Sequence, residues 1–272
     1  MTQLVFACIA PHGSEILEEL SGGNLSLMAR TRASMVELGR RMTSAAPDVL
    51  VVLTPHGTRA EGQFAVANPE RVRGEVQDHG GTVTLERRVD RALAQRIAAE
   101  AATDGVPVAL LNYATSEGPL SVMPLDWGAL IPLWFMPDVP VVVINPPRGM
   151  DFAGHVQFGR ALARAASAAG RRVGLIASAD WSHTHAASGP YGFHPTAAQV
   201  DATVEAYVRA GDLEALATLS ADLVKSAKPD GLWQVLVLAG ALPPTERQVE
   251  LLSYEAPTYF GLLCAAVTPT CV

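Results

Sequence analysis

Residues 47–57, PDVLVVLTPHG, decide the fold class of this chain. Within this stretch the apolar, β-branched run 48–54 stops at a Pro-His-Gly tripeptide whose middle residue is His56. A short unbroken apolar run that ends in proline and glycine is typical of a strand buried on both faces. Residues 4–10 form a second such run, which stops at the same tripeptide around His12. The two stretches therefore predict two buried strands with the same kind of ending.

Outside these two runs, short apolar stretches alternate with longer stretches that carry apolar residues at helical spacing. We expect further strands at 106–112, 139–145, 173–177, 250–254 and 259–267. We expect helices at 31–44, 89–102, 152–169, 197–210, 213–218 and 232–242. Apolar strands that alternate with helices predict a mainly parallel central sheet with helices on both faces. We therefore predict an α/β fold, a single domain over residues 1–272, in which the polar stretch 61–78 is an antiparallel flap or a loop.

The composition excludes several classes of protein. Of the 272 residues, 49% are hydrophobic and 17% are charged, which is far from the composition of a disordered chain. The net charge of −7 argues against nucleic acid as a partner, and no apolar run is long enough to span a bilayer. The first residues lack the basic start of a signal peptide, and three cysteines (Cys8, Cys264 and Cys271) are too few for a disulfide framework. We expect a cytoplasmic protein with reduced thiols, of which Cys8 and Cys264 are buried.

The repeated Pro-His-Gly ending brings two imidazoles to one place. In a parallel sheet the carboxyl ends of the strands lie at one edge, and ligands bind there. His12 and His56 can therefore share a single metal ion. Proline restricts the backbone before each ring, and glycine lets the chain turn directly after it. The alternative is that each tripeptide is only a turn and its histidine only a polar cap.

A third strand leads into residues 178–185, SADWSHTH, at the same edge. His183 can act there as a metal ligand or as an acid–base group, because imidazole titrates near neutral pH; the alternative is a solvated loop. Two imidazoles and one carboxylate, with open positions, form the ligand set of non-haem Fe(II) that activates oxygen. The candidate carboxylates are Asp230, Glu255 and Asp126. Asp230 can equally be the N-cap of the apolar helix that follows it.

Several phrases of the sequence together resemble the type III extradiol ring-cleavage dioxygenases, the LigB-like superfamily. They are the opening APHG, then PDVLVVLTPHG, DWGALIPLWF, SADWSH, GPYGFHP and KPDGLWQVLVLAGAL, and they cover nearly the whole chain. Each phrase is short, but their order and spacing together are specific. The resemblance implies an α/β fold with a mononuclear Fe(II) held by two histidines and a glutamate.

The resemblance also implies roles for particular residues. His12 and His56 match the two metal-binding histidines of the family, and His183 matches a histidine that serves as acid and base beside the metal. Asp230 is the carboxylate nearest to the family's glutamate, although it is shorter and displaced by one position. Trp127 stands where many ring-cleaving members have histidine, a departure that can narrow the pocket or remove a hydrogen bond to the substrate.

The implied activity is that of an oxidoreductase of aromatic compound catabolism, which cleaves a catechol-like or aminophenol-like ring with O2. Its cofactor is Fe(II), although zinc or another divalent metal can fill the same ligands in a purified sample. We expect Trp127, Trp181 and Tyr191 to wall the substrate pocket, with ordinary core packing as the alternative for each. The expected partners are the small aromatic substrate, O2, and either further copies of this chain or a related subunit.

The alternative function is that of a Memo-like binding or regulatory protein, which shares the fold and keeps a metal-capable cleft without cleaving rings. It predicts a pocket with no acidic ligand nearby, or with a cysteine in its place. The dioxygenase requires His12, His56 and a carboxylate to converge on one metal. The two functions therefore differ in a geometry that the folded chain can show.

Overall fold

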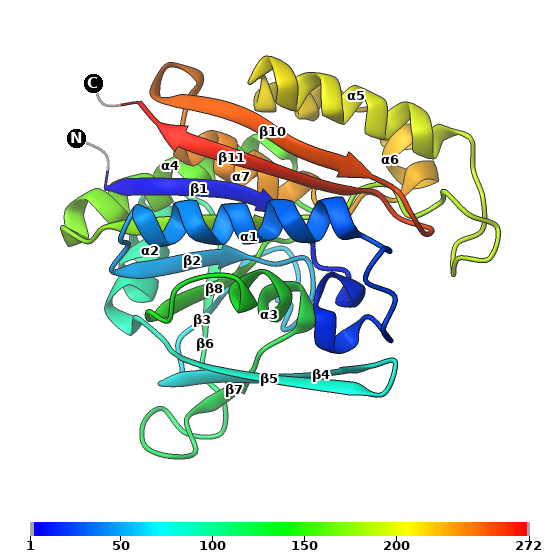
Figure 1. The fold of residues 1–272 in the computed structure, drawn as a ribbon. Coiled ribbons are helices and arrows are strands. Elements are labelled where there is room, and N and C mark those ends of the chain that lie inside the picture. The colour runs from blue at the N-terminus through cyan, green and yellow to red at the C-terminus, as the bar shows by residue number, and fades with distance from the viewer. Residues whose placement is uncertain (1–2, 271–272) are drawn as a thin grey trace.

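The computed structural model describes residues 3–270, and its centre is an eight-stranded sheet in the order β10-β11-β1-β9-β2-β8-β3-β6 (Figure 1). The strands are β1 (Leu4–Ala10), β2 (Val49–Leu53), β3 (Phe64–Ala67), β6 (Val108–Leu111), β8 (Val141–Asn145), β9 (Val173–Ser178), β10 (Arg247–Glu255) and β11 (Leu262–Pro269). The four central strands, β1, β9, β2 and β8, are parallel to one another. Their carboxyl ends therefore meet at one edge, as predicted for the two Pro-His-Gly strands.

Antiparallel pairs complete the sheet on both sides of this parallel core. The hairpin β10–β11 adds to β1, and β3 pairs antiparallel with β8 and parallel with β6. The expected strand 250–254 is thus the middle of a longer one, and the C-terminal strand begins at Leu262, three residues later than predicted. The sheet is mixed but mostly parallel, which confirms the predicted fold class.

Helices cover both faces of the sheet (Figure 1). On one face lie α1 (Ala29–Ser44) and α3 (Trp127–Trp134), and on the other lie α2 (Arg91–Thr103), α4 (Phe152–Ala169), α5 (Thr196–Ala210) and α7 (Leu232–Ala241). The side chains of β1 alternate between them: Phe6 and Cys8 join the core under α1, while Ala7 and Ile9 join the core under α4 and α7. Because both faces of this strand are buried, neither face carries polar side chains, which explains the unbroken apolar sequence.

A second, three-stranded sheet lies beside the main one. It consists of β4 (Arg71–Asp78), β5 (Gly81–Arg88) and β7 (Val122–Pro124), and β4 and β5 form an antiparallel hairpin. The stretch 61–78, left open between flap and loop, is divided between the two sheets, because β3 enters the main sheet and β4 begins the hairpin. The alternating burial of β4 shows one face on the core and one face in solvent.

The remaining elements are short. The two-turn helix α6 (Ala221–Ala227) precedes α7, and 213–218, expected as a helix, is a 3-10 helix. The further 3-10 turns are 14–16, 18–20 and 244–246. Cys8 and Cys264 are buried free thiols, as expected, whereas Cys271 lies outside the described residues. Among residues 3–270, none of the helices has the length and apolar character needed to cross a membrane.

Candidate metal centre

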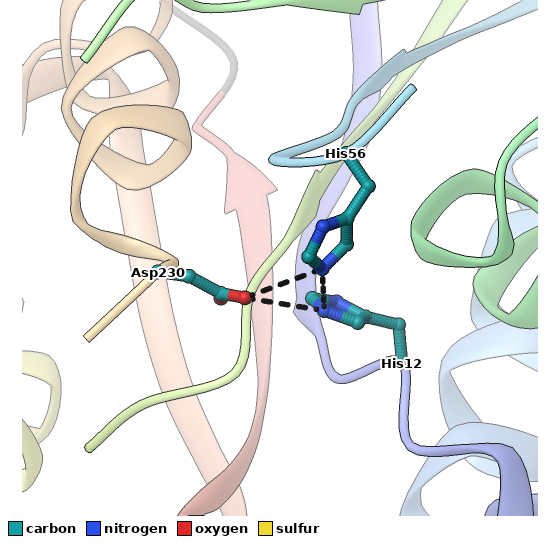
Figure 2. A group of neighbouring side chains, drawn as sticks. All are labelled: His12, His56 and Asp230. Carbon is teal, nitrogen blue, oxygen red and sulfur yellow. Dashed lines mark hydrogen bonds and ion pairs between the residues drawn. The ribbon is translucent and has the colours of Figure 1, made fainter. Parts of the chain in front are cut away.

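Three side chains from distant parts of the sequence converge at the carboxyl edge of the sheet (Figure 2). His12 lies two residues after β1, His56 lies three residues after β2, and Asp230 lies in the link between α6 and α7. The two Nε2 atoms are 3.2 Å apart. Asp230 Oδ2 lies 3.4 Å from His12 Nε2 and 3.5 Å from His56 Nε2. We call these three residues the central triad.

The spacing of the central triad suits one transition-metal ion. Ligand atoms that each lie about 2.0–2.2 Å from the same ion are separated by about 3.0–3.6 Å in tetrahedral or octahedral geometry. The three distances of 3.2, 3.4 and 3.5 Å fall in that range. His12 and Asp230 are buried, and only His56 is partly exposed. Two imidazoles and one carboxylate leave further coordination positions free for small molecules.

His12 is held with its Nε2 directed at the other two residues of the triad. Ser178, the last residue of β9, donates its hydroxyl hydrogen to Gly128 O, so its oxygen is free to accept a hydrogen bond. His12 Nδ1 lies 2.9 Å from that oxygen. His12 Nδ1 therefore carries the proton, and Nε2 presents its lone pair to a metal. Gln234 supports the same strand end by donating from Nε2 to Ser178 O at 3.0 Å.

His56 is positioned by its backbone and by an aromatic neighbour. Asn145 Nδ2 donates to His56 O and ties the end of β8 to the loop after β2. The ring of Trp127 stacks on the imidazole, with 4.0 Å between centroids and 26° between planes. Gly57 has a φ of +82°, and a Cβ there would lie 2.5 Å from Asp126 Oδ2. This turn therefore requires glycine, which explains the last residue of the second tripeptide.

Asp126 lies behind His56 rather than in the triad. Its Oδ1 caps α3 by accepting from Ala129 N at 3.1 Å, and it also accepts from Thr54 Oγ1 at 2.6 Å. Glu255 is farther away, because its Oε1 accepts from Thr31 N and Thr31 Oγ1 at the start of α1. Of the three candidate carboxylates, the fold brings only Asp230 to the two histidines.

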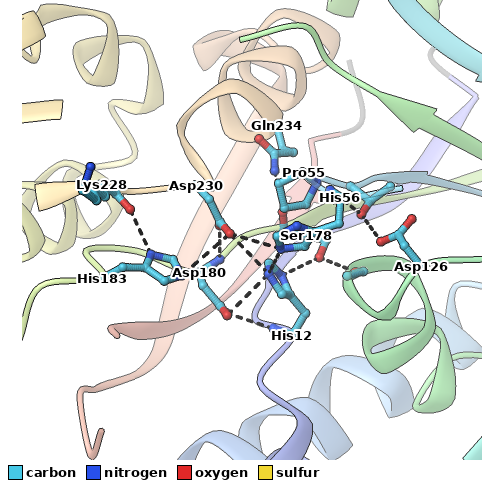
Figure 3. Close-up of polar contacts among 12 residues, drawn as sticks. His12, Pro55, His56, Asp126, Ser178, Asp180, His183, Lys228, Asp230 and Gln234 are labelled. Atoms are coloured by element: carbon cyan, nitrogen blue, oxygen red, sulfur yellow. Dashed lines mark hydrogen bonds and ion pairs between the residues drawn. The ribbon is translucent and has the colours of Figure 1, made fainter. Parts of the chain in front are cut away.

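Asp230 is not the N-cap of α7. The N-cap position is Gly231, and Asp230 Oδ1 instead accepts from Asp180 N at 3.0 Å. Asp180 in turn accepts from His12 N at 2.9 Å through Oδ1, and its Oδ2 lies 3.4 Å from His12 Nε2 (Figure 3). The backbone N–H of Asp180 thus fixes Asp230, the carboxylate of Asp180 fixes the backbone of His12, and Asp230 Oδ2 is left directed at the two histidines.

The negative charge of the buried carboxylates favours a positive charge at the triad. Burial opposes ionisation of Asp230, but the charge and hydrogen bonds of His12, with those of His56, outweigh it and hold the pKa of Asp230 below its usual value. Burial raises the pKa of Asp180, and the neighbouring Asp230 adds to that rise. Burial lowers the pKa of His12, yet Asp180 and Asp230 overcome this and raise it to about 9. The same carboxylates would stabilise a metal cation bound at the triad.

His183 lies beside the triad but outside its ligand distances. Its Nδ1 donates to Lys228 O at 2.9 Å, since a carbonyl oxygen only accepts, and its backbone N donates to Ala227 O (Figure 3). The other ring nitrogen, Nε2, is therefore free to take up or release a proton. It lies 3.8 Å from Asp230 Oδ2, on the side of the cavity. His183 therefore lies outside the group of possible ligands, and its part as a proton carrier stays a prediction.

A buried carboxylate fixes residues 182–185, the segment that carries His183, which we call the His183 strap. Asp201, on α5, accepts from Ser182 N at 3.0 Å, from His185 Nε2 at 2.8 Å and from Tyr254 Oη at 2.8 Å. Burial raises the pKa of Tyr254, and the nearby Asp201 charge raises it further, so the phenol stays protonated as a donor. Asp201 thus holds Ser182 and His185, which lie before and after His183 in the sequence.

A cavity of about 400 Å³ opens onto the triad and is lined by His12, His56, His183, Trp127 and Tyr191. An aromatic ring needs less room than this, since a cavity of about 150 Å³ holds benzene. Trp127 and Tyr191 are half-exposed at the mouth, where a ligand can reach them. Their part in binding substrate stays a prediction.

The expected wall residue Trp181 lies elsewhere. Its side chain is fully buried in the core on the α5 and α7 face of the sheet. The chain is extended here, with Asp180 paired to Leu262, so successive side chains point in opposite directions. Because Asp180 faces the cavity, Trp181 faces the core. The prediction that Trp181 walls the substrate pocket is therefore wrong, and the alternative, core packing, is correct.

Sequence reasoning missed residues that support the site. Ser178 and Asp180 orient members of the triad, and Asp201 holds the His183 strap. A signal was present for the first two, because both lie at the end of the third parallel strand, at the same edge as the tripeptides. Asp201 follows the GPYGFHP phrase of the family resemblance, but no local pattern indicated its role, because its partners lie 16 to 53 residues away.

Comparisons with known proteins identify the family of the chain. The family described as the catalytic LigB subunit of aromatic ring-opening dioxygenase matches residues 6–263. A protein of Clostridium acetobutylicum is 26% identical over 253 residues, which are 91% of this chain and 54% of that protein. The chain thus spans about half the length of this curated relative.

The fold also occurs in a solved structure. The crystal structure of an uncharacterized protein from Escherichia coli K12 has a TM-score of 0.64 and 22% sequence identity. The similarity covers 96% of this chain and 99% of that one. The family match includes both Pro-His-Gly strands, the His183 strap and Asp230. With the match extending over nearly the whole sequence, this chain belongs to the LigB family, that of the catalytic subunits of aromatic ring-opening dioxygenases.

Proposed function

We propose that this protein is an Fe(II)-dependent extradiol dioxygenase that cleaves a catechol-like or aminophenol-like ring with O2. The observation that carries the proposal is the convergence of His12, His56 and Asp230 within 3.5 Å of one another, beside His183. Two neutral imidazoles and one carboxylate suit Fe(II) in oxygen-activating enzymes. When bound, Fe(II) supplies the redox chemistry that lets O2 react with an aromatic ring.

The protein's own residues bind and orient the substrate. Trp127 and Tyr191 flank the cavity and offer apolar faces to a ring. The flat stack of Trp127 on His56 leaves one wall of the cavity at a fixed angle to the metal ligands. A ring held against this wall presents its two adjacent hydroxyls, or one hydroxyl and one amine, to the triad. Orientation of this kind contributes several kcal/mol to catalysis.

His183 moves the proton. Its Nε2 takes the proton of a substrate hydroxyl as the ring binds, and returns it to an oxygen of the product as the ring opens. In the overall reaction, the carbon–carbon bond beside the two hydroxyls breaks and both atoms of O2 enter the product. Atoms and electrons balance without a further reductant, so no second cofactor is needed.

The Memo-like alternative has less support. It predicts a cavity without an acidic ligand, or with a cysteine in its place. Asp230 Oδ2 lies 3.4 Å from His12 Nε2, and the buried thiols Cys8 and Cys264 lie in the core under α1, away from the triad. Assembly with further copies or a related subunit stays a prediction.

The test is anaerobic reconstitution with Fe(II), followed by oxygen-uptake measurements over catechol, protocatechuate and 2-aminophenol. We expect one molecule of O2 to be consumed for each molecule of substrate, with a yellow ring-opened product. Zinc-loaded protein is the matched control, because zinc fills the ligands without redox chemistry. Absence of oxygen uptake over a wide panel of such rings, in protein with a full iron load, contradicts the proposal.

A further inference from the structure

The His183 strap lies against the link between β10 and β11. Gly261 N donates to Ser182 O at 3.1 Å, and His185 N donates to Tyr259 O at 3.1 Å. One of these hydrogen bonds precedes His183 in the chain and the other follows it. The backbone of the strap is therefore tied to the link on both sides of His183.

A ring of the same link fixes the plane of the His183 imidazole. Phe260 is buried, and its ring stacks on His183 with 5.7 Å between centroids and 16° between planes. A Cβ at Gly13 would lie 3.0 Å from Phe260 Cζ. Since Gly13 has a φ of −59°, which any residue adopts, the first tripeptide needs glycine here for space rather than for a turn. Phe260 thus lies between the tripeptide that carries His12 and the imidazole of His183.

Asp201 reaches the strap from α5. Its buried carboxylate accepts from Ser182 N at 3.0 Å and from His185 Nε2 at 2.8 Å. A Cβ at Gly261 would clash with Asp201 Oδ2, so the missing side chain there lets the carboxylate reach the strap. Asp201 does not line the cavity on the triad, whereas His183 does. Any influence of Asp201 on a ligand in that cavity therefore passes through the strap.

The burial of Asp201 makes movement of the strap unfavourable. The third hydrogen bond to its carboxylate comes from Tyr254 Oη at 2.8 Å, and its ion-pair contact within residues 3–270 is the His185 imidazole. A carboxylate that has lost its hydration needs such donors. If the strap shifts, two of the three donors leave while the carboxylate stays buried. The fold therefore favours the one position of the strap that the structure shows.

We propose that Asp201 is a positioning residue for the reaction, because it holds the His183 imidazole where its Nε2 reaches the substrate. The inference rests on the proposed function, in which His183 moves the proton. Proton transfer requires the two heavy atoms to lie within about 3 Å of each other, so a small shift of the ring slows this step. Asp201 itself touches neither the triad nor the cavity.

The first test measures oxygen uptake by Fe(II)-loaded Asp201→Ala, which loses both side-chain bonds to the strap. We expect kcat to fall about 10-fold to 100-fold, while KM and metal content stay within about twofold of the wild-type values. Asp90→Ala is the matched control. Asp90 is a largely buried carboxylate that caps α2, and its backbone N donates to Val141 O at the opposite edge of the sheet. This control keeps the wild-type kcat.

The second test combines Asp201→Ala with His183→Ala. If Asp201 acts through His183, the double variant turns over within about twofold of His183→Ala alone, because the group that Asp201 positions is already absent. If Asp201 only supports the fold, its loss lowers turnover by the same factor in both backgrounds. The second result overturns the proposal.

The third test needs no activity and uses zinc-loaded protein with isotope-labelled histidine. The Nδ1–H of His183, which donates to Lys228 O, gives an NMR signal that is identified by its absence in His183→Ala. We expect this signal to be lost or broadened in Asp201→Ala and retained in Asp90→Ala. An unchanged signal in Asp201→Ala overturns the proposal.

His185→Ala provides a second variant in case Asp201→Ala fails to fold, because it removes one strap donor and leaves the carboxylate in place. We expect the same changes in kcat and in the His183 signal, each smaller than for Asp201→Ala. A wild-type kcat together with a wild-type signal in His185→Ala contradicts the positioning role.

The two kinds of measurement separate this inference from the proposed function. Absence of oxygen uptake by the wild type on every ring removes the proposed function, and the NMR signal in zinc-loaded protein then decides whether Asp201 positions His183. Oxygen uptake by the wild type with an unchanged kcat in Asp201→Ala keeps the function and removes the positioning role.

Discussion

Among residues 3–270, two groups of histidine and carboxylate residues have ligating atoms close enough to hold an ion, and the groups differ in how their side chains are held. The central triad consists of His12, His56 and Asp230. The second, which we call the rim group, consists of Glu15, Asp78 and His79. In the rim group His79 Nε2 lies 3.9 Å from Glu15 Oε1 and 3.7 Å from Asp78 Oδ1, so the spacing is looser than in the triad.

The surroundings of the two groups differ more than their distances. Side-chain exposure is 3% for His12 and 6% for Asp230, but 51% for His79. The triad residues follow rigid strands or are fixed by Ser178 and Asp180, whereas the rim group lies on a 3-10 turn and a hairpin turn.

Proximity of ligating atoms is therefore not enough to make a metal site. In the rim group, the carboxylates are only partly buried, so water can compete for them, and the Ser14 hydroxyl already donates to Asp78. In the triad, the two rings and the carboxylate are oriented before an ion arrives, and desolvation strengthens each electrostatic interaction. We therefore expect one tightly bound metal per chain, at the triad. The following predictions test this contrast.

The largest effect is expected for His12→Ala. Loss of one of the two imidazoles leaves an incomplete site, so metal retained after desalting falls from about one per chain to almost none. The measurement is elemental analysis of protein loaded with Fe(II) or zinc. His79→Ala is the matched control in the rim group and keeps a full load. Equal metal content in wild type and His12→Ala removes the ligand assignment.

A smaller but large effect is expected for His183→Ala. The residue lies outside the ligand distances, so metal content stays near the wild-type value, while turnover falls by about 100-fold to 10,000-fold through loss of the proton carrier. Steady-state oxygen uptake and metal analysis on the same sample give both numbers. Loss of metal together with activity identifies His183 as a ligand instead.

Ser178→Ala tests the hydrogen bond that orients His12. Removal of such a partner typically lowers metal affinity about 10-fold to 100-fold, which chelator competition measures. Ser14→Ala removes the corresponding hydroxyl from the rim group and leaves the affinity unchanged. If both variants retain wild-type affinity, the fixed orientation of the imidazole does not explain the contrast.

The smallest effect concerns an exposed ionic group far from any metal. Hydrogen bonds from Arg40, and then from Arg41, lower the pKa of Glu37 from its ordinary 4.5 to about 2. Their contribution to stability is therefore complete above pH 4.5 and is lost as the pH falls through 2. Because Glu37 is exposed, we expect Glu37→Gln to lower Tm by at most a few degrees at pH 6.

At pH 2 that difference should disappear. Thermal unfolding followed by circular dichroism at the two pH values measures it. A difference that stays constant with pH assigns the effect of the variant to something other than ionisation of Glu37.

Much of the fold could be predicted because two-sided burial leaves a clear signature. The apolar run 4–10 coincides with β1, and the helix predicted at 152–169 coincides with α4. Strand β3 was not predicted, because its four residues follow a polar stretch and become a strand only through pairing with β6 and β8. The two sheets were not separated for the same reason, since pairing partners lie far apart in sequence.

The candidate site was predictable where the metal-binding residue lies in the same short motif that ends a strand. His12 and His56 each follow a strand directly, so the parallel sheet alone brings them together. The choice among Asp230, Glu255 and Asp126 was not predictable, because it depends on how the link before α7 folds back over the sheet edge. Trp181 shows the same limit, since its direction depends on the extended backbone beside Asp180.

The central triad draws its members from the beginning, the first quarter and the last fifth of the sequence. During translation the two imidazoles are made long before the carboxylate, because 173 residues lie between His56 and Asp230. Cation capture with all three ligands therefore has to wait until the link before α7 has been made. Fragments that stop before Asp230 keep both histidines but lack the anionic group that completes the site.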